Sequence, residues 1–242
     1  MPLLPAQSHY LVDVMRMKVG DGVLAFNGRD GEWRCELAQL SKKLWALNAR
    51  ELAREQTPPG DLHYLFAPLK RARLDYMVQK AVELGVSRLQ PVLTQHTQVT
   101  RVNLDRMRAN AIEAAEQCGV LTIPEIGEPL PLGRVLTARE PERLLVFCDE
   151  DADVKDPLKA LADARQSPSA MLPLTMANAG TEGRQPIALL IGPEGGFSEE
   201  ERAIVLKLTN MVRLSLGPRI LRADTAAVAA LALIQTRFGD WR

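Results

Sequence analysis

The sequence predicts an α/β protein in which a parallel sheet, covered by helices on both faces, follows a small β-rich module. Beyond residue 68, short apolar runs alternate with longer segments of helical periodicity, which is typical of a parallel sheet with crossover helices. Before residue 68 the apolar segments are short, and the tight-turn sequence NGRDG separates two of them. We therefore expect two domains, residues 1–68 and residues 69–242.

The first domain contains three predicted strands. GVLAFNG and EWRCEL flank the NGRDG turn, and LWALNARELAR continues the same pattern. The sequence TPPGD at 57–61 predicts a loop, because proline and glycine favour turns. This part of the chain is therefore expected to be a small β-rich module.

The second domain begins with two helices on either side of a strand. LKRARLDYMVQKAVELG predicts a helix that ends at Gly85, and its buried face is expected to contain Leu74, Met77, Val78, Ala81 and Leu84. VSRLQPVLT predicts the strand. Asn103 is expected to cap the next helix, whose buried stripe would consist of Leu104, Met107, Ala111, Ala115 and Cys118.

Three near-continuous apolar runs, RLLVFC, IALLI and MVRLSL, predict strands that are buried on both faces. Residues 165–186 are rich in Ser, Pro, Ala and Gly and predict a loop. Ser198 and Glu201 have the spacing of a capping box, which predicts a helix after IALLI. The chain closes with AAVAALALIQTRF, a predicted helix that is apolar on nearly all sides.

The composition excludes several classes of protein. Of 242 residues, 46% are hydrophobic and 25% are charged, and the formal net charge is zero, as in an ordinary globular protein. No apolar run reaches the roughly 18 residues of a membrane span, and the start lacks the pattern of a signal peptide. Three widely spaced cysteines argue against a disulfide framework and a structural zinc. We expect a cytoplasmic protein with no metal and no membrane partner.

Basic residues gather in the first third of the chain, whereas the acidic segments EEE and DEDAD lie later. The basic residues are Arg16, Lys18, Arg29, Arg34, Lys42, Lys43, Lys70, Arg71 and Arg73. Such a distribution has two interpretations. It could form a surface that faces RNA, or it could consist of solvated charges scattered over the molecule.

Two of the predicted strands end in loops that contain Gly-Pro, GPEGG at 192–196 and GPR at 217–219. In open α/β sheets, ligands bind beyond the carboxyl ends of the strands, and we expect these two strands to be neighbours. The first loop has neither the Walker A nor the G-x-G-x-x-G spacing, which argues against phosphate binding. Backbone amides and carbonyls suit an uncharged flat group such as adenine. The alternative is a pair of tight turns without a ligand.

The loop sequences LLIGPEGGFSEEE and LSLGPRILRADTAAVAAL resemble the RsmE family of 16S ribosomal RNA (uracil-N3)-methyltransferases, within the SPOUT superfamily. The resemblance includes LDYMVQKAVELGVSRLQPV, AAEQCG and HYLVDVMRMKVGDGVLAFNGRDGEW, the last of which is similar to a PUA-like RNA-binding domain. It thus covers most of the chain. The sequence departs from the family at Gln95–Val99 and at Val120, positions that are expected to face substrate RNA.

The resemblance implies a PUA-like β-barrel over residues 1–68 and a SPOUT domain with a C-terminal trefoil knot over residues 69–242. It also implies homodimers that pair through the knotted region, and a pocket for S-adenosylmethionine with two walls. One wall would consist of Leu190, Gly192, Pro193, Glu194, Gly195 and Gly196. The other would consist of Leu216, Gly217, Ile220 and Leu221, with Thr225 at the start of the final helix.

The implied activity is methylation of N3 of one uridine in 16S ribosomal RNA, either as naked RNA or in the small ribosomal subunit. Because N3 carries a proton, an arginine is expected to stabilise the developing anion, and we assign this role to Arg222, with Arg219 second. Alternatively, these arginines could only cap a neighbouring strand. Arg16 and Arg29 are expected to bind RNA. No cysteine is expected to be catalytic, because N3 needs no thiolate adduct.

Two other functions remain open at this point. One is a SPOUT methyltransferase that acts on another RNA target, such as a ribose hydroxyl or a different base. The other is a non-catalytic RNA-binding protein that keeps the fold. Binding of S-adenosylmethionine would separate the second alternative from both enzymes, and the identity of the methylated nucleoside would separate the first.

Overall fold

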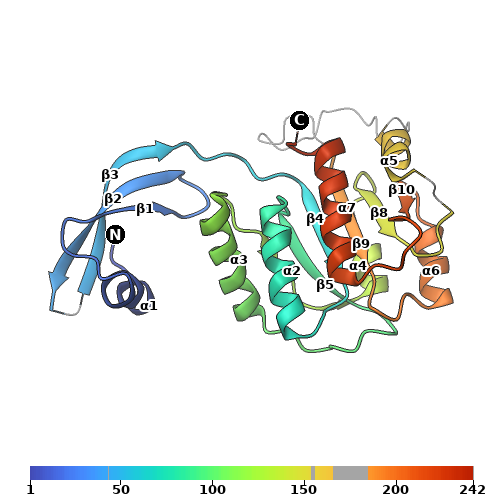
Figure 1. Cartoon of the computed structure of the whole chain (residues 1–242), viewed down its shortest axis with the longest axis horizontal. Coiled ribbons are helices and arrows are strands. Elements are labelled where there is room, and N and C mark those ends of the chain that lie inside the picture. The colour runs from blue at the N-terminus through green and yellow to red at the C-terminus, as the bar shows by residue number, and fades with distance from the viewer. Residues whose placement is uncertain (43, 154–155, 166–184, 242) are drawn as a thin grey trace. The chain divides into compact units, whose positions relative to one another are not determined.

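The computed structural model describes residues 1–42, 44–153, 156–165 and 185–241, which form two compact units, Met1–Thr57 and Pro58–Arg242 (Figure 1). The first strand after TPPGD, β4 (Leu62–Phe66), pairs with strands of the second unit. The observed division therefore lies before β4, whereas the sequence-based boundary between residues 68 and 69 lies after it. The loop at 57–61 separates the units, because the buried run that follows belongs to the parallel sheet.

The first unit is an antiparallel sheet with one helical segment packed against it. The strands β1 (Gly22–Phe26), β2 (Glu32–Ser41) and β3 (Leu44–Arg54) pair in chain order, and in the described residues this sheet is open rather than closed into a barrel. The helix α1 (Pro5–His9) continues into a π-helical turn, η1 (Tyr10–Val14). Its small core consists of Leu3, Leu11, Cys35, Leu37 and Leu47.

The turn between β1 and β2 confirms the hairpin that NGRDG predicts. The side-chain oxygen of Asn27 accepts hydrogen bonds from the backbone amides of Arg29 (3.0 Å) and Asp30 (2.9 Å). Gly28 and Gly31 both have a φ of 80°, in the left-handed region that glycine adopts without strain. The turn therefore depends on both glycines and on the asparagine side chain.

The second unit has a parallel sheet in the order β10-β8-β9-β4-β5-β6, and β7 also pairs with β5. Its further strands are β5 (Arg88–Leu93), β6 (Glu125–Ile126), β7 (Leu130–Pro131), β8 (Leu144–Cys148), β9 (Ile187–Ile191) and β10 (Met211–Leu214). Its helices are α2 (Arg71–Glu83), α3 (Leu104–Cys118), α4 (Leu132–Thr137), α5 (Pro157–Arg165), α6 (Glu199–Leu206) and α7 (Ala223–Phe238).

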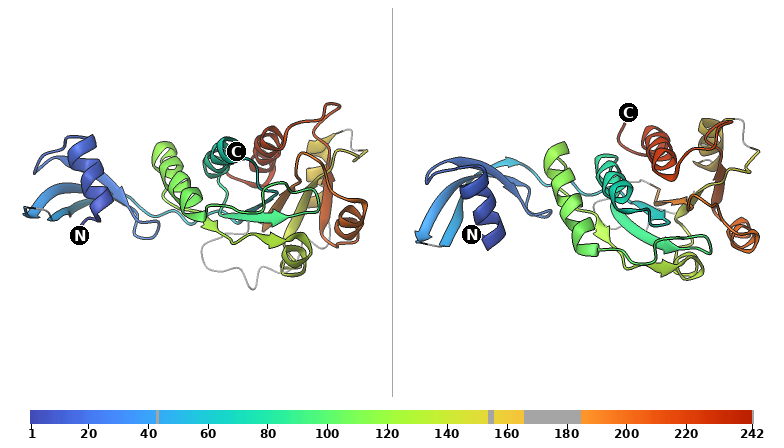
Figure 2. Two further views of the ribbon diagram at one scale, coloured as in Figure 1. Left: turned by 90° about the horizontal axis from the view of Figure 1, so that it is seen from below. Right: turned by 60° about the horizontal axis from the view of Figure 1, so that its bottom comes forward.

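Helices cover both faces of this sheet, as the sequence predicts (Figure 2). On one face, Leu65, Leu145 and Leu190 pack into a core with Val135 of α4 and Val205 of α6. On the other face lie α2, α3 and α7, with α2 between the other two (Figure 1). Each central strand therefore contributes alternate side chains to two cores, which explains its continuous apolar sequence.

The helix predictions are confirmed at most positions. Asn103 caps α3 by accepting a hydrogen bond from the Arg106 amide (3.0 Å), and the capping box of Ser198 and Glu201 starts α6. Cys118, however, is exposed, so its predicted place in the core is wrong. It is the last residue of α3, where the chain turns away through Gly119, and the buried stripe ends before it.

Two further points concern the end of the chain and the predicted loop. The final helix begins at Ala223 and not at Thr225, because Arg222 already serves as its N-cap residue. Most of the loop predicted over 165–186 falls on residues 166–184, outside the described residues. Within the part of the chain that is described, no helix has the length and apolar character needed to cross a membrane.

Candidate functional site

Three strands end at the edge of the sheet where the two glycine loops begin. The order β10-β8-β9 places β8 between the strands that carry these loops, so the prediction that IALLI and MVRLSL are neighbours is wrong. Strands in a sheet lie about 4.8 Å apart, so the two loops leave the sheet about 10 Å from each other. The segment after β8, residues 149–153, begins between them. Sequence reasoning missed this third segment.

Two glycines of the loop after β9 lie against protein side chains. A Cβ at Gly192 would be 2.5 Å from the Phe197 ring, which in turn packs on the sheet. A Cβ at Gly195 would be 3.3 Å from the Cβ of His96. The absence of side chains at these positions therefore allows close packing inside the protein. Letting a ligand approach the backbone is thus not the only role of these two glycines.

Gly196 closes a tight turn in the same loop. Its φ is 69°, and its amide donates to the carbonyl of Pro193 at 3.0 Å. A Cβ at this position would lie 2.6 Å from a carboxylate oxygen of Glu150, in the segment after β8. A side chain at Gly196 would thus be unfavourable for both its backbone conformation and its contact with Glu150.

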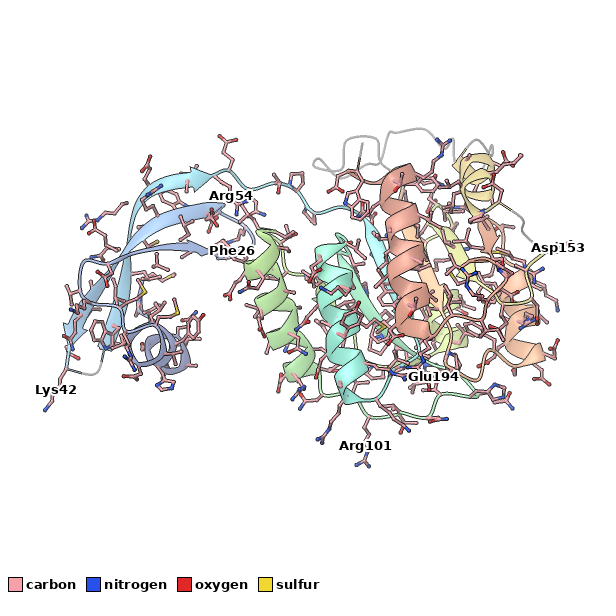
Figure 3. All side chains as sticks on the ribbon, viewed as in Figure 1. Phe26, Lys42, Arg54, Arg101, Asp153 and Glu194 are labelled. Carbon is pink, nitrogen blue, oxygen red and sulfur yellow. The ribbon has the colours of Figure 1, made fainter. Side chains whose placement is uncertain are left out.

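The outer side of this loop is joined to two helices. Glu194, labelled in Figure 3, forms an ion pair with Arg73 in the first turn of α2. The Nε atom of Arg73 also lies 3.9 Å from a carboxylate oxygen of Asp224, the second residue of α7. Arg73 therefore links the start of α2, the loop after β9 and the start of α7.

A cavity of about 340 Å³ lies beside this junction. Its polar or charged lining residues include Lys70, Arg73, His96, Gln98 and Glu194. His96 and Gln98 belong to the segment QHTQV, one of the two places where the sequence departs from the family that it resembles. The cavity therefore has a cationic wall and lies on the β4–β5 side of the loop after β9.

His96 has a defined orientation in this cavity. Its Nδ1 atom lies 3.0 Å from the carbonyl oxygen of Gly195 and 3.2 Å from that of Gly196. Carbonyl oxygens only accept hydrogen bonds, so Nδ1 carries a proton and donates it. In the neutral ring this leaves Nε2 with a free lone pair.

The loop after β10, residues 215–222, is more open. Gly217 has a φ of 100°, and no described atom lies within 4 Å of the position that its Cβ would take. Leu216 and Leu221 are half-buried, whereas Ile220 is 93% exposed. This loop thus combines accessible backbone with apolar side chains, the properties that a flat adenine ring requires.

Arg219 and Arg222 are both exposed, and within the described residues neither guanidinium has a hydrogen bond or an ion pair. The Arg222 carbonyl accepts a hydrogen bond from the Ala226 amide at 2.8 Å, which starts α7. Thr225 is the third residue of this helix and is exposed. Both arginines therefore remain available to an anionic group, and they do not cap a strand in this structure.

Carboxylates dominate the segment after β8. Asp149 is buried and accepts hydrogen bonds from Arg213 at 2.6 and 3.0 Å, and Arg202 lies 3.4 Å away. Its amide donates to the carbonyl of Leu214 at 3.1 Å, which connects the segment to β10. Glu150 follows and contacts the loop after β9. The segment is therefore attached to the loop after β9 and to the end of β10.

Cys148 is the last residue of β8 and the cysteine next to these loops. Burial, with a smaller contribution from Asp149, raises the pKa of its thiol to about 12. A thiol with this pKa is not a nucleophile at neutral pH. The structure thus supports the expectation that this cysteine is not catalytic. The described residues contain no group of three or more His, Cys, Asp or Glu that could hold a metal ion.

The predicted RNA-binding residues lie in the first unit. Arg16 is exposed and has a φ of 57°, and no ion pair to it occurs in the described residues. Arg29 is exposed and lies 3.3 Å from Asp30. Other arginines of this unit form cross-strand ion pairs; Arg54, at the end of β3 in Figure 3, pairs with Glu32 at 2.8 Å. The basic front of the chain is therefore partly neutralised.

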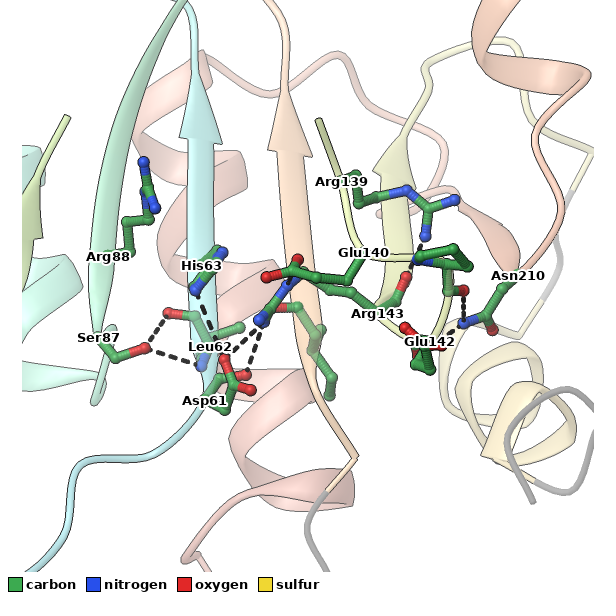
Figure 4. Close-up of polar contacts among 12 residues, drawn as sticks. Asp61, Leu62, His63, Ser87, Arg88, Arg139, Glu140, Glu142, Arg143 and Asn210 are labelled. Atoms are coloured by element: carbon green, nitrogen blue, oxygen red, sulfur yellow. Dashed lines mark hydrogen bonds and ion pairs between the residues drawn. The ribbon is translucent and has the colours of Figure 1, made fainter. Parts of the chain in front are cut away.

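The opposite, amino-terminal edge of the sheet carries an ion network centred on Arg143 (Figure 4). Arg143 is almost fully buried and donates to Asp61 at 2.6 Å and to Glu140 at 2.8 Å. The hydrogen bond from Arg143 lowers the pKa of Glu140 to about 2. Burial, together with Arg143, lowers the pKa of the adjacent His63 to about 4. His63 is therefore a packed neutral residue.

The loops at the carboxyl edge fit the adenosine part of S-adenosylmethionine. Accessible backbone at Gly217, apolar side chains at Leu216 and Leu221, and carboxylate oxygens after β8 lie at the ends of adjacent strands. These groups match an aromatic base and a ribose without requiring a phosphate site. The donor set is therefore appropriate to this cofactor.

Comparison with known proteins agrees with this interpretation. The chain matches the RNA methyltransferase domain family over residues 56–235 and the RNA methyltransferase PUA domain family over residues 4–44. Ribosomal RNA small subunit methyltransferase E of Synechocystis sp. is 30% identical over 96% of this chain and 71% of that protein. The protein of the same name from Rickettsia conorii is 28% identical, over 94% of this chain and 85% of its own.

Solved structures with the same fold cover nearly the whole chain. A methyltransferase from Legionella pneumophila, in complex with the bound cofactor S-adenosylmethionine, is 29% identical with a TM-score of 0.77, over 98% of this chain and 91% of its own. Ribosomal RNA small subunit methyltransferase E from Neisseria gonorrhoeae has a TM-score of 0.78 at 24% identity, over 100% of this chain and 94% of its own. On this evidence the chain belongs to the ribosomal RNA small subunit methyltransferase E family of RNA methyltransferases.

Proposed function

We propose that this protein uses S-adenosylmethionine to methylate N3 of one uridine in 16S ribosomal RNA, and that it acts in the cytoplasm. Its relatives of that name and the Legionella structure with bound cofactor support the proposal. The observation that carries it is the position of the loop after β9. One side of this loop faces the segment after β8, and the other side lines the cavity of about 340 Å³. Cofactor and target base can therefore meet across a single loop.

The residues of the cofactor site act mainly by positioning. When bound, S-adenosylmethionine supplies an electrophilic methyl group. The backbone of residues 192–196 and the loop with Leu216, Gly217, Ile220 and Leu221 hold the adenosine, and Thr225 lies in the first turn of α7. The side chain of Leu190 is fully buried in the core and supports the loop after β9 from within the sheet. Holding two reactants in the correct geometry supplies a large part of the acceleration in such a reaction.

The cavity receives the target base in this proposal. Lys70 and Arg73 line it and would bind the phosphates beside the base, since ammonium and guanidinium groups both pair with phosphate. The Nε2 atom of His96 would accept the N3 proton, because the other ring nitrogen is already engaged as a donor. Arg222, with Arg219 second, would stabilise the negative charge that develops on the uracil oxygens.

A purified-enzyme assay tests this function. The protein is incubated with methyl-labelled S-adenosylmethionine and either naked 16S RNA or small subunits that lack the modification, and the nucleosides are then identified by mass spectrometry. We expect 3-methyluridine, and a loss of about 10²–10³ in kcat for Arg222→Ala. Arg108→Ala, which removes an exposed arginine of α3, is the control and should keep full activity.

Other outcomes of the assay would reassign the function. A different methylated nucleoside would support a methyltransferase with another RNA target. If the wild-type protein binds RNA but does not bind S-adenosylmethionine, it is a non-catalytic RNA-binding protein.

We further propose that the chain forms a homodimer and that its C-terminal segment forms the trefoil knot that the resemblance implies. In the sheet, β10 pairs with β8 and not with β9, the strand that precedes it in the chain. This strand order supports the unusual chain path that a knot requires. The exposed Ile220 and the 46% exposed Tyr76 of α2, a helix that packs against α7, support an apolar interface. Light scattering at micromolar concentration should give the mass of a dimer; the mass of a monomer would refute the pairing.

A further inference from the structure

Glu150 lies in the segment after β8, where this segment meets the loop after β9. It is the second residue after β8, and β8 is the strand between β9 and β10. One carboxylate oxygen would be 2.6 Å from a Cβ at Gly196, so the carboxylate lies directly against the backbone of the loop after β9. The preceding residue, Asp149, is hydrogen-bonded to the end of β10. Glu150 therefore lies between the strand ends from which the two predicted walls extend.

The carboxylate of Glu150 retains the capacity to accept hydrogen bonds. Its side chain is 49% exposed, and its ion pair with Arg202 is long, at 3.7 Å. In the described parts of the chain no group donates a hydrogen bond to it. The neighbouring Asp149 differs in this respect, because its side chain is 1% exposed and is already bonded to Arg213.

The surrounding ion pairs hold this carboxylate in place. Arg202 of α6 lies 3.4 Å from Asp149 and also pairs with Asp151, so the residues on both sides of Glu150 share one guanidinium. Arg202 is itself 13% exposed. Because the segment is already fixed in this way, it loses little conformational entropy when a ligand binds.

We propose that Glu150 accepts hydrogen bonds from the ribose hydroxyl groups of S-adenosylmethionine, as a third wall of the cofactor site. The two oxygens of a carboxylate match two adjacent hydroxyl donors, and acidic residues bind ribose hydroxyls in the same way in dinucleotide-binding folds. The inference rests on the proposed cofactor. The positively charged amino group of the methionine part is the other donor that a carboxylate would attract, and the experiment below separates the two.

Calorimetric titration with two ligands tests the assignment. S-adenosylmethionine contains both the ribose and the amino group, whereas 5′-methylthioadenosine contains only the ribose. Glu150→Gln keeps the size of the side chain but replaces one acceptor with a donor. We expect this substitution to lower the affinity for both ligands by about 10- to 100-fold, the range for loss of a hydrogen bond to a charged group. Circular dichroism and thermal unfolding establish that the variant is folded.

Asp153→Asn is the matched control. It removes the same charge from the same segment, but its side chain is exposed and forms no ion pair with another described residue. We expect it to bind both ligands with wild-type affinity. A 2′,3′-dideoxy derivative of 5′-methylthioadenosine should bind wild type and Glu150→Gln with similar, weakened affinity, because both hydroxyl donors are absent from both complexes.

Three results would overturn the assignment. Wild-type affinity of Glu150→Gln for both ligands would remove Glu150 from the site. Loss of affinity for S-adenosylmethionine alone, with 5′-methylthioadenosine unaffected, would place the carboxylate at the amino group instead. If the wild-type protein binds neither ligand, the proposed function itself fails, and the assignment fails with it.

Discussion

The two edges of the parallel sheet are built on opposite physical principles. At the amino-terminal edge, Arg143 is buried and shares its charge between Asp61 and Glu140. At the carboxyl-terminal edge, Gly217 has open space around it and Arg222 has no described partner. The charges at the amino-terminal edge thus pair within the protein, whereas the carboxyl-terminal edge, beside the pair of Asp149 and Arg213, also leaves polar groups available to a ligand. Stability and binding should therefore respond to different substitutions.

The largest effect is expected at the amino-terminal edge. Arg143→Ala would remove the buried guanidinium that pairs with Asp61 and Glu140, and we expect it to lower the free energy of unfolding by about 3 kcal/mol, since both carboxylates are partly exposed. Urea unfolding followed by circular dichroism measures this loss. At a temperature where the variant is folded, its affinity for S-adenosylmethionine should be unchanged.

Arg134→Ala is the control for this substitution, because Arg134 lies on the nearby α4 but is exposed. Its cost should be within about 0.5 kcal/mol. Equal costs for the two variants would mean that the ion network does not stabilise the fold.

The pH dependence of stability should report on the same edge. The folded protein lowers the pKa of His63 from 6.5 to about 4, so the unfolded chain binds a proton first as the pH falls. Stability should therefore be constant above pH 6.5 with respect to this group, and should decrease by about 3 kcal/mol between pH 6.5 and 4. Glu140, whose pKa is lowered to about 2, adds a further loss below about pH 4.5.

His63→Gln tests the origin of this dependence. The variant should show a much flatter stability profile between pH 6.5 and 4, whereas His9→Gln, which changes an exposed histidine, should keep the wild-type profile. If the two variants have the same profile, the buried histidine is not responsible.

A smaller effect is expected at the carboxyl-terminal edge, and it should appear in binding. Gly217 has a φ of 100°, so alanine there costs roughly 1–2 kcal/mol or shifts the loop. We expect Gly217→Ala to lower the affinity for S-adenosylmethionine by about tenfold, with little change in the midpoint of urea unfolding. Gly133→Ala in α4 also meets open space, but without a positive φ, and should leave the affinity unchanged. A reversal of these two results would place the cofactor elsewhere.

The smallest effect is expected for substitutions in the first unit. They should change neither the stability that depends on the amino-terminal edge nor the cofactor affinity that depends on the carboxyl-terminal edge. Arg16→Ala with Arg29→Ala is expected to weaken binding of a 16S RNA fragment and to reduce its salt dependence, because fewer counterions are released. Arg50→Ala, whose guanidinium pairs with Glu36 at 2.7 Å, serves as the control and should have little effect. An unchanged salt slope in the double variant would show that these two arginines do not contact RNA.

Much of the fold can be predicted from local sequence patterns. Periodicity identifies α2 and α3, and the apolar runs identify β8, β9 and β10, because these signals depend only on neighbouring residues. The misplaced Cys118 shows the limit of this approach. A helical stripe predicts which side of a helix faces the core, but not where the cover provided by other elements ends.

The strand order could not be predicted in the same way, because it depends on contacts between distant segments. Residues 144–148 and 211–214 pair directly, although IALLI lies between them in the chain. The expectation of a two-walled pocket therefore left out the segment after β8. A signal was present, since DEDAD directly follows the buried run RLLVFC, and the rule that places ligands at strand ends applies to it equally.

The central claim is the chemical identity of the product, and one measurement tests it most directly. Ribosomal RNA from a strain that lacks this protein is digested and its modified nucleosides are mapped by mass spectrometry, beside RNA from the same strain supplied with wild type or with Arg222→Ala. The account predicts that 3-methyluridine disappears from one position of 16S RNA, returns with wild type and remains low with Arg222→Ala. Unchanged 3-methyluridine in the deletion strain, or the loss of a different methylated nucleoside, would contradict it.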